Sequence, residues 1–269
     1  MRFRWLAVFP LLYAAAFLLA AWWLRGAAPA LALFVPGQRI VVRILAVAGC
    51  FVAASVFERG DHLRRAWLWL GWGAVAILLR DLLRLLPPFQ PASAGPGAQI
   101  IVSGLGILSN VALLAGVWAL ARSWKMAAIE LPGGRSGIIA VAAVTAVLAV
   151  AVAGPGALKN ARELAAGDWG SLILFVSAVA DIISLCLITP LLLTAVSLRG
   201  GVFSWPWGLI TASQLSWLLY DAAAGLTPAL GLRGFPVMAE TFRGMAENYL
   251  FVAGVAQYLV IRQVRRAAG

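Results

Sequence analysis

The chain contains eight continuous apolar runs, each close to the length that a helix needs to cross a lipid bilayer. They cover residues 6–24, 40–57, 66–86, 99–121, 137–154, 170–194, 204–222 and 245–262. About 20 helical residues cross a hydrocarbon layer of about 30 Å, and only helices or closed barrels satisfy their backbone hydrogen bonds inside it. Barrel strands alternate strictly between polar and apolar residues, and these runs do not. We therefore predict an all-α integral membrane protein with about eight transmembrane helices.

The composition agrees with this fold class. Hydrophobic residues make up 63% of the chain and charged residues 12%, whereas an average soluble domain has about 45–50% and 25%. The linkers between the runs are short and rich in Pro and Gly, so we expect no soluble domain. The first run follows two arginines, as in a signal peptide, but it is longer than the usual apolar segment and ends at two tryptophans. We expect it to be a retained span.

Rare residue types exclude several kinds of site. The only cysteines, Cys50 and Cys186, lie inside apolar runs, and His62 is the only histidine. A disulfide framework, a zinc cluster and a bis-histidine haem site are therefore excluded, and the sequence identifies no cofactor. It also lacks GxSxG, HExxH and paired-aspartate motifs, so we predict that the protein is not an enzyme.

The distribution of positive charge predicts the orientation. The net charge is +11, and we attribute the excess to anchors beside the spans and to anionic lipid head groups rather than to nucleic acid. If the N-terminus is cytoplasmic, twelve of the 21 Lys and Arg residues fall on the cytoplasmic side. The positive-inside rule then favours a multi-pass inner-membrane protein with both termini in the cytoplasm. The longer connections, 87–98 and 223–244, would be external.

An internal repeat is indicated when the chain is compared with itself at a shift of 140 residues. Asp81 then falls on Asp221 and, after a slip of two residues, Asn110 falls on Asn248. These matches carry weight because polar residues are scarce and the chain has only three asparagines. Four spans separate the equivalents, so we predict a parallel duplication of spans 1–4 and 5–8. The corresponding units are residues 1–130 and 131–269.

Polar residues inside the predicted spans are the candidate functional positions, because a charge at the bilayer centre costs about 2.5–3.5 kcal/mol on insertion scales. The candidates for ligand or ion binding are Asp181, Ser177, Ser184, Asp221, Gln214, Asp81, Asn110, Glu247, Asn248 and Arg43. The residues at 177, 181 and 184 share one helical face, which indicates either a proton or cation site or a hydrogen-bonded helix contact.

Helical spacing also predicts local ion pairs. Asp81 is three residues before Arg84, and Arg243 is four residues before Glu247. Arg43 is a candidate cation to oppose the charge of Asp181. An alternative for the acids near span ends is that they extend to the head groups.

With the N-terminus inside, most candidate positions fall in the outer half of the membrane or near its centre. This distribution predicts an outward-facing polar vestibule that binds a lipid, a quinone or a small periplasmic ligand. We expect a membrane sensor or an assembly subunit, with membrane lipids and a protein partner or a second copy as its partners. The alternative is a small-solute or ion transporter or channel built from two parallel repeats.

Overall fold

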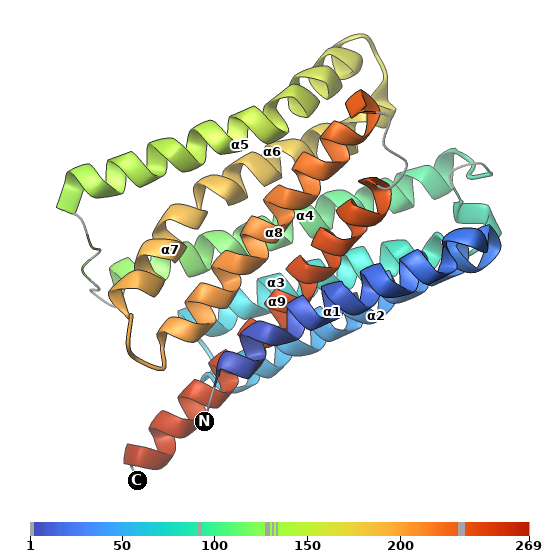
Figure 1. Cartoon of the computed structure of the whole chain (residues 1–269). Helices are drawn as coiled ribbons and strands as arrows, with labels where there is room; N and C mark the ends of the chain where they lie inside the picture. The colour runs from blue at the N-terminus through green and yellow to red at the C-terminus, as the bar shows by residue number, and fades with distance from the viewer. Residues whose placement is uncertain are drawn as a thin grey trace.

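The structure, a computed structural model, describes residues 3–90, 93–126, 130, 132, 134–230 and 235–268. Within these residues the chain is helical and has no strand, which confirms the all-α prediction (Figure 1). The helices are α1 (Arg4–Trp23), α2 (Ala28–Ser55), α3 (His62–Leu83), α4 (Pro96–Met126), α5 (Gly134–Ala165), α6 (Leu172–Cys186), α7 (Ile188–Ser197), α8 (Ser204–Leu230) and α9 (Phe235–Ala268). Single turns of 3₁₀ helix lie at Leu24–Gly26, Pro87–Phe89 and Trp169–Ser171.

Six helical segments in the described part of the chain are long and apolar enough to cross a membrane. They are Arg4–Gly26, Ala28–Ser55, His62–Leu83, Pro96–Met126, Ser136–Ala165 and Trp169–Ser197. Their number supports a multi-pass membrane protein. The remaining long helices, α8 and α9, pack along each other, and α9 also packs against α1 and α2.

Helix α7 continues in the direction of α6, and the other successive helices run in opposite directions, so both chain termini lie at the same end of the bundle (Figure 1). We call this the terminal end; it also carries the turns at 56–61 and 198–203. We call the other end the vestibule end; it carries the segments 24–27, 84–90, 93–95 and 166–171. The last turns of α9 project beyond the bundle at the terminal end (Figure 1).

Glycines allow two pairs of helices to approach very closely. A Cβ placed on Gly254 of α9 would lie 2.2 Å from the carbonyl oxygen of Gly49 on α2, far inside van der Waals contact. On α3, a Cβ at Gly73 would lie 2.7 Å from the Leu113 side chain of α4. Small residues at such crossings are a common means of helix association in membranes. The α2–α9 crossing brings together the two helices that carry most of the charged residues described below.

The main hydrophobic core occupies the half of the bundle nearest the terminal end. It joins the last turns of α2 and α4 and the middle of α9 to the first turns of α3 and α8 and to α7. Its fully buried members include Cys50, Trp67, Leu120, Leu191, Ile210, Val252 and Val260. Burial of this apolar surface leaves the polar residues concentrated toward the vestibule end.

The helix boundaries correct three details of the sequence analysis. Helix α2 begins at Ala28 rather than near residue 40, because Pro36 is accommodated inside it. The segment 155–165, which lies beyond the predicted run 137–154, is the last part of α5. Most of the predicted external connection 223–244 is helical, since α8 ends at Leu230 and α9 begins at Phe235; residues 231–234 lie outside the described residues.

The sixth predicted span consists of two helices. Helix α6 ends at Cys186 and α7 begins at Ile188, with Leu187 between them. Pro190 has no backbone N–H to donate to the carbonyl of Cys186, so the helical hydrogen-bond pattern is interrupted there. The predicted sixth span is therefore interrupted at Leu187.

Candidate ligand-binding vestibule

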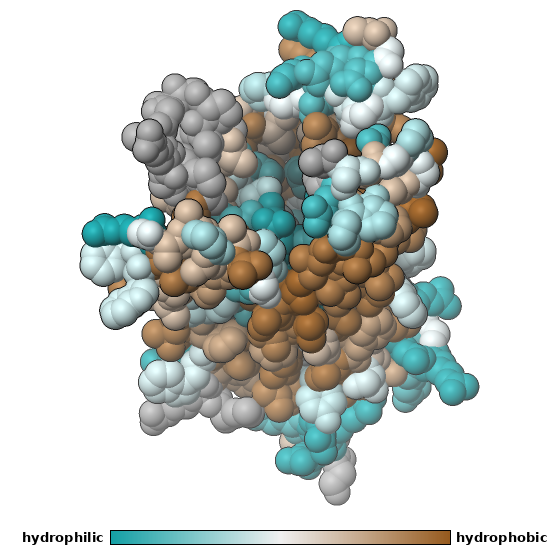
Figure 2. All heavy atoms as spheres, turned by 90° about the vertical axis from the view of Figure 1, so that its right-hand side faces the viewer, coloured by the Kyte–Doolittle hydropathy of each residue, from teal (hydrophilic) through white to brown (hydrophobic). Residues whose placement is uncertain are grey.

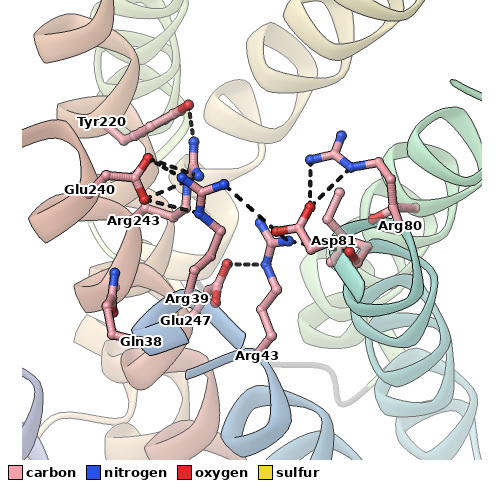
Figure 3. Close-up of polar contacts among 12 residues, drawn as sticks. Gln38, Arg39, Arg43, Arg80, Asp81, Tyr220, Glu240, Arg243 and Glu247 are labelled. Carbon is pink, nitrogen blue, oxygen red and sulfur yellow. Dashed lines mark hydrogen bonds and ion pairs between the residues drawn. The ribbon is translucent and has the colours of Figure 1, made fainter. Parts of the chain in front are cut away.

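Arg43 lies at the centre of a buried ion-pair cluster that joins three helices. Its Nε donates to Oε1 of Glu247 at 3.1 Å, and its Nη1 donates to Oδ2 of Asp81 (Figure 3). The same Nη1 also donates to the Ile77 carbonyl at 3.2 Å. All three charged side chains are buried, and each carboxylate forms an ion pair with Arg43. Together they connect α2, α3 and α9.

One turn nearer the vestibule end, Arg39 forms a second set of ion pairs. Its Nη2 and Nε donate to the two carboxylate oxygens of Glu240 at 2.9 and 3.2 Å. Arg243 reaches the same carboxylate at 3.0 Å and also donates to the hydroxyl of Tyr220 on α8. The guanidinium of Arg243 lies 4.5 Å from the centre of the Tyr220 ring. These contacts add α8 to the helices that the network joins (Figure 3).

Asp81 connects the two sets. Besides Arg43, it interacts with Arg80 through Oδ1 at 3.3 Å, and Nη1 of Arg39 is 3.9 Å from Oδ2. Side chains on a helix lean toward its N-terminus, and α2 starts at the vestibule end. Both α2 arginines therefore direct their guanidinium groups toward the vestibule end, where α3 ends beside Asp81.

The exposure of these side chains falls from the opening inward. It is 26% for Arg39 and 14% for Glu240, but only 3% for Arg43. The network thus has an accessible outer layer and a buried inner layer. A view onto the vestibule end shows hydrophilic atoms recessed in a hollow between protruding helices (Figure 2).

A groove of about 720 Å³ begins at this outer layer. Helix α2 and the preceding 3₁₀ turn form one wall, and α8 and α9 contribute the remainder. Its lining residues are Arg25, Ala28, Leu31, Ala32, Val35, Pro36, Arg39, Tyr220, Ala224, Val237, Ala239 and Glu240. Most of the lining is apolar. Arg25 lies at one end of the groove, and Arg39 and Glu240 lie at the other.

Helix α1 supports the same region from outside. The Tyr13 hydroxyl donates to Oε1 of Gln38, the residue before Arg39. A Cβ at Gly244 of α9 would lie 2.7 Å from the Tyr13 ring, so glycine makes room for this aromatic side chain. The contact holds α1 against both α2 and α9 beside the ion-pair network.

The structure brings together three of the residues predicted from sequence. Arg43, Asp81 and Glu247 form the inner cluster described above. Asn248 is fully buried next to Glu247, but its amide donates to the Gly244 carbonyl at 2.9 Å. One oxygen of Glu247 and the amide oxygen of Asn248 have no hydrogen-bond partner among the described residues.

A second group of predicted residues lies across the bundle, on α6 and α8. Asp181 and Asp221 are half-buried and close enough to interact electrostatically, and Asp221 also faces Arg243. Ser177 and Ser184 are half-buried on α6, and within the described residues neither hydroxyl bonds to Asp181. The predicted serine–aspartate hydrogen bonding is therefore absent there, and Arg43 pairs with other acids rather than with Asp181.

Two further candidates stand apart from the ion-pair network. Gln214 is buried on α8, whereas Asn110 is half-buried on α4, and neither hydrogen-bonds to the network. The neighbour of Asn110, Ser109, makes the interhelical contact, donating to the Gly73 carbonyl at 2.8 Å.

The predicted local pairs are wrong. Arg84 is exposed and forms no ion pair with Asp81 in the described structure, and Arg243 pairs with Glu240 instead of Glu247. Local pairs on an exposed helix contribute only about 0.2–0.5 kcal/mol. An unpaired charge buried between helices costs much more free energy. Asp81 and Glu247 therefore pair with Arg43 on a neighbouring helix.

Arg39 and Glu240 were missed from sequence, although a signal was present. Arg39 and Arg43 are four residues apart, and the α9 residues 240, 243 and 247 follow helical spacing along one face. A basic face on one helix and a mixed charged face on another indicate an interhelical ladder. Arg39 was overlooked because residues 36–39 resemble a linker before the second span.

No group of three or more His, Cys, Asp or Glu side chains in the described part of the chain is placed to hold a metal ion. Comparison with protein-family models, curated proteins and solved structures finds no match to this chain. The geometry of the vestibule is therefore the evidence that bears on its function.

Proposed function

We propose that this protein is a non-enzymatic inner-membrane sensor or assembly subunit that binds a small or lipid-like ligand in its vestibule. In this proposal α8 and α9 also cross the membrane, giving eight spans with both termini in the cytoplasm. The vestibule then faces the periplasm. A parallel duplication of residues 1–130 and 131–269 remains our proposal for the origin of this arrangement.

The contrast between the two halves of the bundle is the observation that carries the proposal. The vestibule end has a groove with partly exposed charged residues, whereas the core of the terminal half is built from tightly packed apolar side chains. Buried hydroxyls in that half, such as those of Thr194 and Thr211, donate to carbonyls of their own helices. A solute entering the groove would therefore meet a closed floor, which favours binding over passage.

Transport is the second candidate, and the break at Leu187 favours it. Discontinuous helices near the middle of a bundle form the ion and substrate sites of many transporters. Asp181 lies less than two turns before this break and interacts with Asp221. A cation passing between α6 and α8 would use these acids rather than the groove.

One pair of measurements separates the two functions. Purified protein is tested for thermal stabilisation by phospholipids, quinones and small periplasmic metabolites, and the same preparation is tested for ion and solute flux in proteoliposomes. The proposal expects a ligand that stabilises the protein without flux above that of empty vesicles. Flux that is lost in Asp181→Asn would support transport instead.

A further inference from the structure

We infer that the groove binds a single-chain anionic amphiphile, with its carboxylate or phosphate at Arg39 and its chain along the first three turns of α2. This inference rests on the proposed ligand-binding function and names the class of ligand.

The wall formed by α2 is a continuous apolar surface. Residues 28, 31, 32, 35 and 36 follow helical spacing on one face and all line the groove. On the other wall, Ala224 and Ala239 are small and leave space rather than fill it. Because Ala28–Ser55 is apolar enough to span the membrane, a hydrocarbon chain on this face stays in apolar surroundings.

The charge at the inner end of the groove favours an anion. Among the described residues, Glu240 is the only acid that lines the groove, and it already accepts from both Arg39 and Arg243. Nη1 of Arg39 is 3.9 Å from Asp81, which is beyond hydrogen-bond length. An incoming carboxylate or phosphate therefore reaches N–H groups of Arg39 without displacing Glu240.

The dimensions suit one chain. A volume of about 720 Å³ lies within the range of about 300–1,000 Å³ found for small-molecule sites. From Ala28 to Arg39, α2 rises about 16 Å. Arg25, stacked on the Trp22 ring at 4.5 Å, marks the outer end of the groove near the interface. An extended acyl chain can lie along this length.

Binding of tritiated palmitate to the purified full-length protein tests the inference. Palmitoyl lysophosphatidate and monopalmitoylglycerol are the competitors, because they carry the same chain with a phosphate and with a neutral head group. We expect both anionic amphiphiles to bind at least tenfold more tightly than the neutral one. Weaker competition by lysophosphatidate than by unlabelled palmitate identifies a carboxylate as the preferred head group, and stronger competition identifies a phosphate.

Variants locate the site. Arg39→Gln should weaken binding of the anionic amphiphiles at least tenfold, while the matched control Arg84→Gln, an exposed arginine at the same end, should leave it unchanged. Val35→Trp leaves the ion pairs intact and fills the groove, so it should weaken binding even if Arg39→Gln does not fold. Equal affinity for the neutral competitor, or unchanged affinity in Val35→Trp, overturns the inference. Stabilisation of the same preparation by a different ligand would leave the proposed function standing.

Discussion

Nε of Arg43 lies 3.1 Å from Oε1 of Glu247, a contact between residues 204 positions apart in the sequence. Asp81 completes the group, and all three side chains are buried. Inside a membrane protein, such a group is stable only if each buried charge is compensated by an opposite charge in the cluster or next to it. It therefore fixes how α2, α3 and α9 are arranged.

Removing the central cation should destabilise the protein strongly. Arg43→Met leaves two buried carboxylates without their shared partner, and a loss of about 3–5 kcal/mol is expected for such a change. We expect a lower Tm in detergent, measured by tryptophan fluorescence. The triple variant Arg43→Met, Asp81→Leu, Glu247→Met should recover part of the loss, and Arg122→Gln is the exposed control. A triple variant no more stable than Arg43→Met alone would contradict this explanation.

The α2–α9 crossing should tolerate no side chain. Gly254→Val places a Cβ at the position of the Gly49 carbonyl, so α2 and α9 must move apart. The ion pairs between these two helices would then be disrupted. We expect loss of folded, monodisperse protein in size-exclusion chromatography. Gly104→Ala is the matched control, because a Cβ there meets no atom within 4 Å. Its higher helix propensity should be neutral or stabilising by up to about 1 kcal/mol.

The charge of Asp181 on α6 should not be needed for stability. Its carboxylate has no ion-pair partner among the described residues and lies near Asp221, so Asp181→Asn removes a charge that is costly to bury and should keep or raise the Tm in detergent. Glu58→Gln, a change at an exposed acid of the terminal end, should have no effect. A clear loss of stability in Asp181→Asn would mean that its carboxylate holds a cation or a buried partner.

The membrane orientation is testable with single cysteines after Cys50 and Cys186 are replaced by alanine. Gln90→Cys at the vestibule end should react with a membrane-impermeant thiol reagent in intact cells. Glu58→Cys at the terminal end should react only after the membrane is permeabilised. The reverse pattern would place the vestibule in the cytoplasm and refute its outward orientation.

The sequence predicted the helical membrane fold well because hydrophobic length is a local property. The apolar runs correspond to helices, with the sixth divided at Leu187. Boundaries were less accurate where proline or charge interrupts a run, as at Pro36, because a proline inside a helix resembles a linker when packing is unknown. Helices α8 and α9 also extend beyond the predicted runs 204–222 and 245–262, because charged residues or proline interrupt the apolar pattern there.

Three members of the ion-pair network were named from the sequence, but their partners were not. Arg43, Asp81 and Glu247 were recognised because a charge within an apolar run is conspicuous. Their partners depend on which helices touch, and one sequence does not contain that information. Arg39 and Glu240 lie outside the predicted apolar runs, so only the structure shows that they form the outer layer of the vestibule.

The water accessibility of two introduced cysteines tests directly whether the vestibule is closed toward the terminal end. Both are placed in the Cys50→Ala, Cys186→Ala background. Ala224→Cys lines the groove, and Ala256→Cys lies in the fully buried apolar core. In sealed proteoliposomes of known orientation, a charged thiol reagent should modify the cysteine at 224 from the vestibule side and the cysteine at 256 from neither side. Modification at 256 as fast as at 224 would reveal a continuous aqueous path and contradict the account.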